Sequence, residues 1–168
     1  MMCVAVGEDK APDISFIAEL TDVFRIGGTK SGALIGEAIV IPNQELSDDF
    51  EYLIKQRGAL LSKGRLLGLQ FKCLFENNLF FEINKHANSL AQRISNAVLN
   101  KGFTLSAETE SNQIFPVLPN SLIELLSQRF EFYIWKAIDA DNSIVRLVTS
   151  WATEEAKVSE LVKIIEDY

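Results

Sequence analysis

Residues 20–38 read LTDVFRIGGTKSGALIGEA, and this stretch decides the fold class of the chain. The segments at 23–26 and 37–41 are rich in the apolar and β-branched residues that favour strands, and a glycine-rich connection separates them. Just before them, apolar residues recur at helical spacing over 14–20. A helix next to two strands predicts an α/β layer in which a buried sheet is flanked by helix.

The composition is that of a folded globular protein with an acidic surface. Of the 168 residues, 48% are hydrophobic and 23% are charged, and the net charge is −7. We expect neither a nucleic-acid nor a membrane partner, because nucleic acids and anionic membranes reward clustered Lys and Arg. No apolar run approaches the roughly 18 residues that span a bilayer, and no basic region precedes the apolar stretch at the amino terminus. Two cysteines, Cys3 and Cys73, favour reduced thiols and a cytoplasmic location.

The middle of the chain is predicted to be helical. After the break at Pro42-Asn43, Ser47 should begin a helix as an oxygen-bearing cap. Between 60 and 75 the apolar residues cover more than one face, which predicts a helix packed between layers. A single apolar stripe then runs over 77–101 and is closed by Gly102, which predicts a helix that links two domains.

The last third of the chain has a different pattern, in which short strands alternate with helices, as is typical of an α+β module. Short strands are predicted at 113–118, 130–138 and 144–150, with helices beginning near 119 and 153. The fold class is therefore α/β, with a partial large-domain layer that holds the lysine loop and long helices, followed by an α+β small domain. The corresponding boundaries are 1–76 for the remnant of the large domain, 77–102 for the linking helix and 103–168 for the small domain.

Lys30 is the most informative position for chemistry. It is the only charged residue from Ile26 to Gly36 and directly follows a predicted buried strand. Desolvation there would favour the neutral amine that Schiff-base chemistry requires, although a lysine in a glycine-rich loop can also be an ordinary surface lysine. A phosphate-binding loop needs glycine directly before the lysine and again five positions earlier, where this chain has Thr29 and Phe24, so that interpretation fails.

The lysine stretch resembles the corresponding segment of L-threonine aldolases and related β-eliminating lyases, which are pyridoxal-phosphate (PLP) enzymes of fold type I. The resemblance includes the strand before Lys30, the loop of small residues and the Gly-Glu-Ala that follows at 36–38. It continues in the same order through KQRG at 55–58, SKGRLL at 62–67, HANSLA at 86–91 and VRLVTSWAT at 145–153. It therefore covers nearly the whole chain and corresponds to the carboxyl-terminal half of such an enzyme, with residues 1–76 as a remnant of the PLP-binding domain.

The resemblance implies roles for individual residues. Lys30 would bind PLP as a Schiff base and later move protons, and Arg146 would bind the α-carboxylate of a small amino-acid substrate through its planar fork. A surface ion pair is the alternative for Arg146. Lys63 and Arg65 are further candidates for substrate binding, with solvated helix charge as the alternative.

Several other residues have structural alternatives. Thr29 and Ser31 could contact the cofactor phosphate, or be simply the small residues that a loop needs. His86, the only histidine, is expected to be structural, because nothing near it has metal-ligand spacing and no metal site is predicted. The aromatic residues Phe130, Phe132, Tyr133 and Trp135, together with Trp151, are interpreted as core or interface.

The implied function is that of a threonine aldolase type lyase, which cleaves a β-hydroxy amino acid to glycine and an aldehyde. Members of the family pair an aspartate with the cofactor ring, in an Asp-Gly-Ala-Arg-like motif upstream of the lysine, and Asp9, Asp13 and Asp22 lack that context. We therefore expect this chain to be only part of the competent enzyme, acting as a homo-oligomer or with a missing amino-terminal half. The alternatives are a β-eliminating amino-acid lyase and a catalytically inactive assembly module or truncated remnant.

Overall fold

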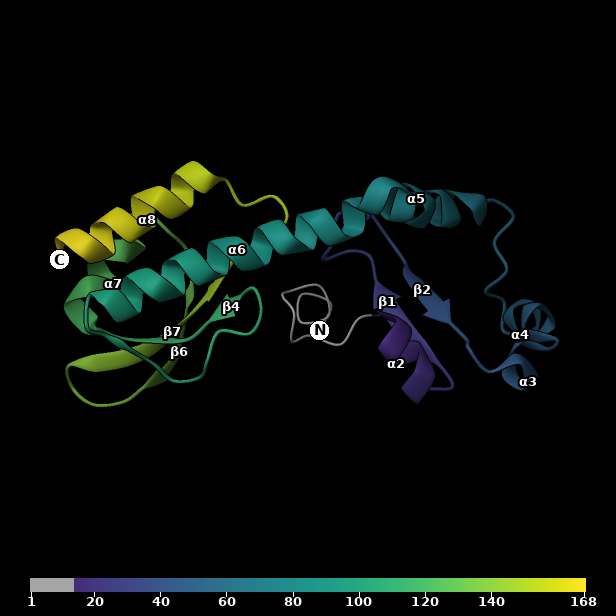
Figure 1. The fold of residues 1–168 in the computed structure, drawn as a ribbon, viewed down its shortest axis with the longest axis horizontal. Coiled ribbons are helices and arrows are strands. Elements are labelled where there is room, and N and C mark those ends of the chain that lie inside the picture. The colour runs from purple at the N-terminus through teal and green to yellow at the C-terminus, as the bar shows by residue number, and fades with distance from the viewer. Residues whose placement is uncertain (1–13) are drawn as a thin grey trace. The chain divides into compact units, whose positions relative to one another are not determined.

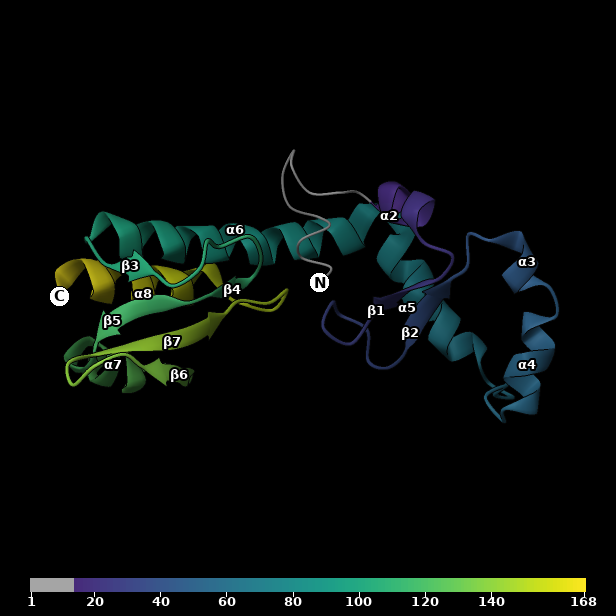
Figure 2. The same ribbon diagram turned by 90° about the horizontal axis from the view of Figure 1, so that it is seen from below.

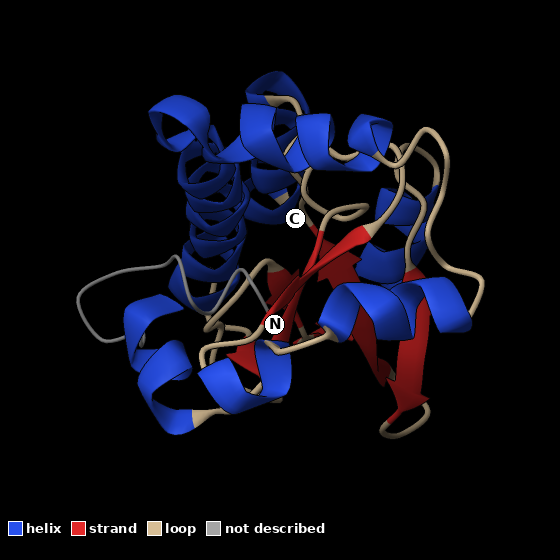
Figure 3. Ribbon diagram, turned by 90° about the vertical axis from the view of Figure 1, so that its right-hand side faces the viewer, coloured by secondary structure: helices blue, strands red, loops and turns tan. Residues whose placement is uncertain are grey.

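A computed structural model describes residues 14–168, so Cys3, Asp9 and Asp13 lie outside the described part of the chain. The chain forms two compact units that divide between Ile83 and Asn84. Helix α6 (Leu79–Asn100) belongs to both, with its first five residues in the first unit and the rest in the second. Helices are blue and strands red in Figure 3, where the mixed helix and strand content is visible.

The first unit is built on an antiparallel hairpin rather than on a buried layer. Strand β1 (Phe24–Gly27) pairs with β2 (Glu37–Val40) in the register Phe24↔Val40 and Gly27↔Glu37. The helices of this unit are α2 (Ile14–Leu20), α3 (Gln44–Ser47), α4 (Phe50–Gln56), α5 (Arg65–Phe75) and a single 3-10 turn, η1 (Glu76–Asn78). Of the eight strand residues, only Ile26 is buried.

The core of the first unit is small and aromatic. Ile26, Ala33, Leu74 and Phe80 are buried together, and Phe71, Phe75 and Phe81 pack against them. The rings of Phe75 and Phe80 stack with their centroids 4.9 Å apart. Between them the chain turns at Asn77 and Asn78, whose φ angles of 53° and 62° end α5 and allow α6 to begin in a new direction.

Three expectations for the first unit are corrected by the structure. Four of the eight residues in the two strands are half-buried, three are exposed and one is buried, so the predicted buried sheet is wrong for the described residues. Helix α5 is not packed between layers, since Leu74 is its only buried residue and Leu66 and Leu69 are exposed. Ser47 ends helix α3 instead of capping a new one, and the cap of α3 is Asn43, whose side chain accepts a hydrogen bond from the Glu45 N–H (3.0 Å).

The second unit is an antiparallel sheet covered by helices on one face. Its strands are β3 (Thr104–Leu105), β4 (Gln113–Ile114), β5 (Pro116–Pro119), β6 (Tyr133–Ala137) and β7 (Asn142–Val148). Strand β7 is central, because β4 and β5 pair with it along one edge and β6 pairs with it along the other (Figure 2). The helices are α6, α7 (Asn120–Ser127) and α8 (Glu155–Asp167).

The core of the second unit lies between this sheet and the three helices. Its buried residues include Leu90 and Ile94 from α6, Leu122 and Leu126 from α7, Leu161 and Ile165 from α8, and Val145 and Leu147 from β7. Helices α6 and α8 run in the same direction (Figure 1), and the Arg93 side chain donates to Ser159 Oγ (3.0 Å) while Lys101 Nζ donates to the Glu166 carbonyl (2.8 Å). The apolar stripe predicted over 77–101 lies on α6 and supplies Leu90 and Ile94 to this core, so that prediction is confirmed.

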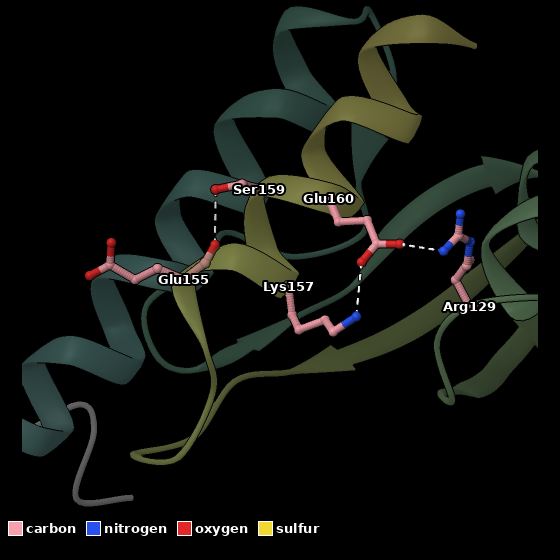
Figure 4. A network of polar contacts seen from close by, with 5 residues as sticks. All are labelled: Arg129, Glu155, Lys157, Ser159 and Glu160. Carbon is pink, nitrogen blue, oxygen red and sulfur yellow. Dashed lines mark hydrogen bonds and ion pairs between the residues drawn. The ribbon is translucent and has the colours of Figure 1, made fainter.

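Local polar contacts fix the ends of the elements in the second unit. Gly102 adopts a φ of 92° and closes α6, as predicted, with its N–H bonded to the Leu99 carbonyl (2.9 Å). At α8, Glu160 binds both Lys157 and Arg129 at 3.0 Å (Figure 4), and the hydrogen bond from Lys157 lowers the pKa of that carboxyl. In the turn between β6 and β7, backbone N–H groups of Asp141 and Asn142 donate to Asp139 and lower the pKa of its carboxyl.

Candidate functional site

Lys30 lies in the loop that joins β1 to β2, residues 28–36. The loop is a compact turn built around the backbone of Gly28. The Gly28 carbonyl accepts from the N–H groups of Ser31 (2.9 Å) and Ala33 (3.0 Å), and the Gly28 N–H donates to the Gly36 carbonyl (3.3 Å). These bonds close the loop on both sides of Lys30, so its backbone is held rather than free.

Helix α5 fixes the far side of the same loop through Gln70. The Gln70 side-chain oxygen accepts from the N–H groups of Leu34 (2.7 Å) and Ile35 (3.2 Å). The side-chain nitrogen donates to the Ile35 carbonyl (3.3 Å) and back to the Leu66 carbonyl (3.2 Å) of its own helix. One side chain therefore satisfies three backbone groups of the loop, which would otherwise depend on water.

Close packing also explains the glycine at position 28. A Cβ there would lie 2.7 Å from Ala33 Cβ, 2.8 Å from Phe71 Cζ and 3.1 Å from the Gly36 carbonyl oxygen. The φ of Gly28 is not among the positive values, so space rather than backbone conformation demands the glycine. Gly32 and Gly36, with φ of 91° and 103°, are required for the opposite reason, since L side chains rarely adopt those angles.

The side chains on this loop divide by exposure. Lys30 and Thr29 are exposed, and Ser31 is buried at 3% exposure. Within the described chain, Lys30 has neither an ion pair nor a hydrogen bond to its amine. The expectation that Lys30 is desolvated at the mouth of an apolar layer is therefore not met by this unit, whereas the expectation of a lysine presented on a small-residue loop is.

Lys63 and Arg65 lie in the same unit, at the start of α5. Both are exposed, and Arg65 is the first residue of the helix. Neither makes an ion pair within residues 14–168. Two cations at a helix amino terminus are disfavoured by the helix dipole, so the intrinsic stability of α5 does not explain them.

Arg146 belongs to the second unit, on the central strand β7. Its neighbours Val145 and Leu147 point into the core, so Arg146 projects from the opposite face of the sheet. Its guanidinium carbon lies 5.2 Å from the ring centre of Tyr133 and 5.7 Å from that of Trp135. Its Nε atom is buried without a hydrogen-bond partner, and it forms no ion pair in the part of the chain that the structure describes. The proposed alternative of a surface ion pair thus finds no partner among these residues.

An unpaired buried donor on a cation is a costly feature that calls for an explanation. Leaving such a donor unsatisfied costs about 1–3 kcal/mol, and more when the group is charged. A guanidinium has five N–H donors in a planar fork that matches a carboxylate. Within residues 14–168, the fork of Arg146 meets no carboxylate.

His86 and the aromatic residues have mixed outcomes. His86 Nε2 lies 3.0 Å from the Thr153 carbonyl oxygen, a contact that fits the structural role expected for this histidine. Phe130 and Phe132 pack against the core, as predicted. Tyr133 and Trp135, however, are 69% and 58% exposed, so of the predicted core or interface role the core part is wrong for them, and the interface part stays a prediction.

The described residues hold neither a metal-binding cluster nor a membrane-spanning helix. No group of three or more His, Cys, Asp or Glu side chains within residues 14–168 is arranged to hold a metal ion. No helix in the same residues is long and apolar enough to cross a membrane.

No protein-family model matches the chain. Among proteins of known function, it is 37% identical over 151 residues to a low specificity L-threonine aldolase of Pseudomonas sp. (strain NCIMB 10558), covering 86% of this chain and 42% of that protein. The threonine aldolase structure from Leishmania major aligns with a TM-score of 0.88 and 40% identity, over 99% of this chain and 49% of the other.

More distant structures share the fold alone. Serine palmitoyltransferase of Sphingomonas wittichii aligns with a TM-score of 0.62 and 15% identity, over 95% of this chain and 43% of that one. A structure of SPT with a PLP internal aldimine aligns with a TM-score of 0.57 and 15% identity, over 87% of this chain and 39% of that one.

The fold therefore matches part of the fold of the fold type I pyridoxal-phosphate enzymes. Within that class it is homologous to the low specificity L-threonine aldolases, which confirms the resemblance read from the lysine stretch. It spans about two fifths of the length of these curated relatives and about half of the solved threonine aldolase chain.

Gln70, Tyr133 and Trp135 were missed as contributors to these two sites. Gln70 hydrogen-bonds to the backbone of a loop 35 residues away, and no local sequence pattern predicts such a contact. Tyr133 and Trp135 reach Arg146 only because β6 pairs with β7, and the register of that pairing cannot be predicted from the sequence of either strand alone. Their position on a predicted strand near a charged strand residue was the one available signal.

Proposed function

We propose that this chain is the lysine-bearing part of a PLP-dependent lyase of the threonine aldolase type. The observation that carries the proposal is the fixed loop at 28–36, which presents the free amine of Lys30 while Gly28 and Gln70 hold its backbone. Homology to the threonine aldolases supports the aldolase reaction over a β-elimination. The substrate is a small β-hydroxy amino acid, cleaved between Cα and Cβ to glycine and an aldehyde.

The residues of the loop fit the covalent attachment of PLP. Attachment needs an accessible, unpaired amine at a defined position, and Lys30 provides one. The exposed Thr29 hydroxyl is better placed to meet a phosphate than Ser31, which is buried. When bound, PLP supplies the electron sink that lets a bond to Cα break.

The roles of the chain's own side chains follow from their chemistry. Lys30 binds the cofactor and then serves as a base and acid that moves protons near Cα. Arg146 orients the substrate, because its free donors suit the α-carboxylate. Lys63 and Arg65 add positive charge that favours an anionic substrate or phosphate, and their lack of partners supports that role.

We further propose that the chain is not competent by itself. The groups that would hold the cofactor ring and phosphate are expected to come from a second polypeptide segment or a second subunit. The support for this is that the chain spans 42% of a curated relative and 49% of a solved one. An acidic partner for the ring nitrogen is central to the electron sink, and no aspartate close to Lys30 in the sequence has the context expected for it.

Reductive labelling tests the assignment of Lys30. The purified chain is incubated with PLP, reduced with borohydride and mapped by peptide mass spectrometry, with Lys30→Gln and Lys63→Gln prepared in parallel. We expect the Lys30 peptide to be labelled before that of Lys85, which is also an exposed lysine and lies on helix α6. Lys63→Gln should leave that preference intact. Equal labelling of Lys30 and Lys85 would contradict the proposal.

Activity separates the remaining functions. L-threonine cleavage to glycine by the isolated chain should be absent, and should appear when the missing part of the fold is supplied. Ammonia release in place of glycine would indicate the β-eliminating alternative. A chain that labels at Lys30 but gains no activity with a complementing segment would be an assembly module.

A further inference from the structure

Tyr133 and Trp135 stand beside Arg146 because of how β6 pairs with β7. Tyr133 is directly opposite Arg146 in the register, and Ile134 is opposite Val145. The register then shifts, so that Lys136 rather than Trp135 is opposite Ile144, and Trp135 is the extra residue of a bulge. The Trp135 ring centre lies 5.7 Å from the Arg146 guanidinium carbon, next to that of Tyr133 at 5.2 Å.

The cluster extends one residue further along the same face. The Phe115 ring, between β4 and β5, meets the Trp135 ring edge to face at 5.5 Å and an interplanar angle of 67°. Trp135 is thus supported from one side by Phe115 and contacts Arg146 on another. Neither aromatic ring beside Arg146 belongs to the core, and both are more than half exposed, so burial alone does not explain them.

Aromatic rings hold a guanidinium in a way that an acid does not. Both ring centres lie within the ~6 Å over which a cation is attracted to an aromatic face. That contact involves the charge and the flat face of the guanidinium, so the N–H donors at its edge remain available for hydrogen bonds. A carboxylate partner would instead consume those donors, and no such partner is found for Arg146 in residues 14–168.

We propose that Tyr133 and Trp135 are positioning residues that hold the Arg146 guanidinium with its donors free for the substrate carboxylate. The inference rests on the proposed function, because it assumes that Arg146 binds a carboxylate. It adds that the geometry of that contact is set by an aromatic pair on a neighbouring strand. Loss of either ring should leave Arg146 in place but less well ordered.

Nuclear magnetic resonance of the full chain tests this directly. The side-chain Nε–H signal of Arg146 is assigned with Arg146→Lys, and its shift, relaxation and response to L-threonine are measured. The probe control is L-threoninol, which lacks the carboxylate. Leucine and phenylalanine are placed in turn at positions 133 and 135, and Trp151→Leu serves as a matched control, because Trp151 is a half-exposed tryptophan of the same unit that does not contact Arg146.

We expect Tyr133→Leu and Trp135→Leu each to increase the mobility of the Arg146 Nε–H group and to reduce the ring-current shift of its signal. Each variant should also weaken L-threonine binding by about threefold to fivefold. The phenylalanine variants should retain most of the affinity, and Trp151→Leu should change nothing. If the leucine variants bind L-threonine as the unsubstituted chain does, the positioning role is wrong while the role of Arg146 stands. If L-threonine and L-threoninol act alike on the unsubstituted chain, the carboxylate role in the proposed function fails, and the inference fails with it.

Discussion

Gly28→Ala should displace the lysine loop, because the added methyl group has no room. Its nearest neighbours would be Ala33 Cβ at 2.7 Å and Phe71 Cζ at 2.8 Å, about 1 Å closer than ordinary carbon contacts. The Phe71 ring can swing away, but Ala33 Cβ is bonded directly to the backbone of the loop. Relief therefore requires the loop itself to move, and Lys30 moves with it.

The cost can be estimated from these contacts. Overpacking of this kind costs about 1–3 kcal/mol, and replacing glycine with alanine returns about 0.4–1 kcal/mol by restricting the unfolded chain. We expect Gly28→Ala to lower the free energy of unfolding by about 1–2 kcal/mol. Urea unfolding followed by fluorescence measures this, and PLP labelling of Lys30 measures the displacement of the loop.

Gly27→Ala is the matched control, one residue earlier. A Cβ at position 27 would meet nothing within 4 Å, and its φ is not positive. It should be neutral or slightly stabilising and should leave Lys30 labelling unchanged. Equal stability and equal labelling of the two variants would refute the account of the packed loop.

Three other predictions concern the contacts around the two units. Gln70→Ala should cost about 1–2 kcal/mol in urea unfolding and slow Lys30 labelling, whereas Gln70→Glu, which keeps the acceptor, should recover part of both. Gly102→Ala should lower the free energy of unfolding by about 1 kcal/mol, because φ is 92° at that position. Gly68→Ala lies in open space within α5 and should raise the free energy of unfolding by about 0.5–1 kcal/mol. Thermal unfolding that ranks the two variants the other way would contradict this prediction. The pKa of Asp139 in the folded chain lies below its unfolded value, so the stabilisation from its carboxylate should be present above the usual carboxyl range and lost as the pH falls through the folded pKa. The difference in free energy of unfolding between the unsubstituted chain and Asp139→Asn should therefore shrink on acidification, as measured by urea unfolding at several pH values.

The sequence predicted those elements whose signals are local. The stripe that becomes α6 and its glycine cap at Gly102 depend on neighbours three or four residues apart, so both were read correctly. The strands on either side of Lys30 were also found, because runs of apolar and β-branched residues next to a glycine-rich connection mark them. Homology to the threonine aldolases was read from residues in order along the chain, which needs no knowledge of space.

The errors came from properties that depend on distant residues. Ser47, followed by two aspartates, was expected to cap a new helix, but it ends α3, which Asn43 caps, and the next helix, α4, has Asp49 at its cap position. Burial of β1 and α5 was inferred from apolar content, yet an apolar residue is buried only if another element covers it. The contacts of Gln70 and Trp135 depend on tertiary packing and on the pairing of β6 with β7, neither of which has a sequence period.

The position of β7 in its sheet limits how Arg146 can move. The strand is hydrogen-bonded along both edges, to β4 and β5 on one side and to β6 on the other. Shifting its backbone would break two ladders at once, whereas rotating the arginine side chain breaks none. Any adjustment of this arginine to ligands of different size must therefore come from side-chain torsions, which change in nanoseconds, and not from the slower sliding of a strand.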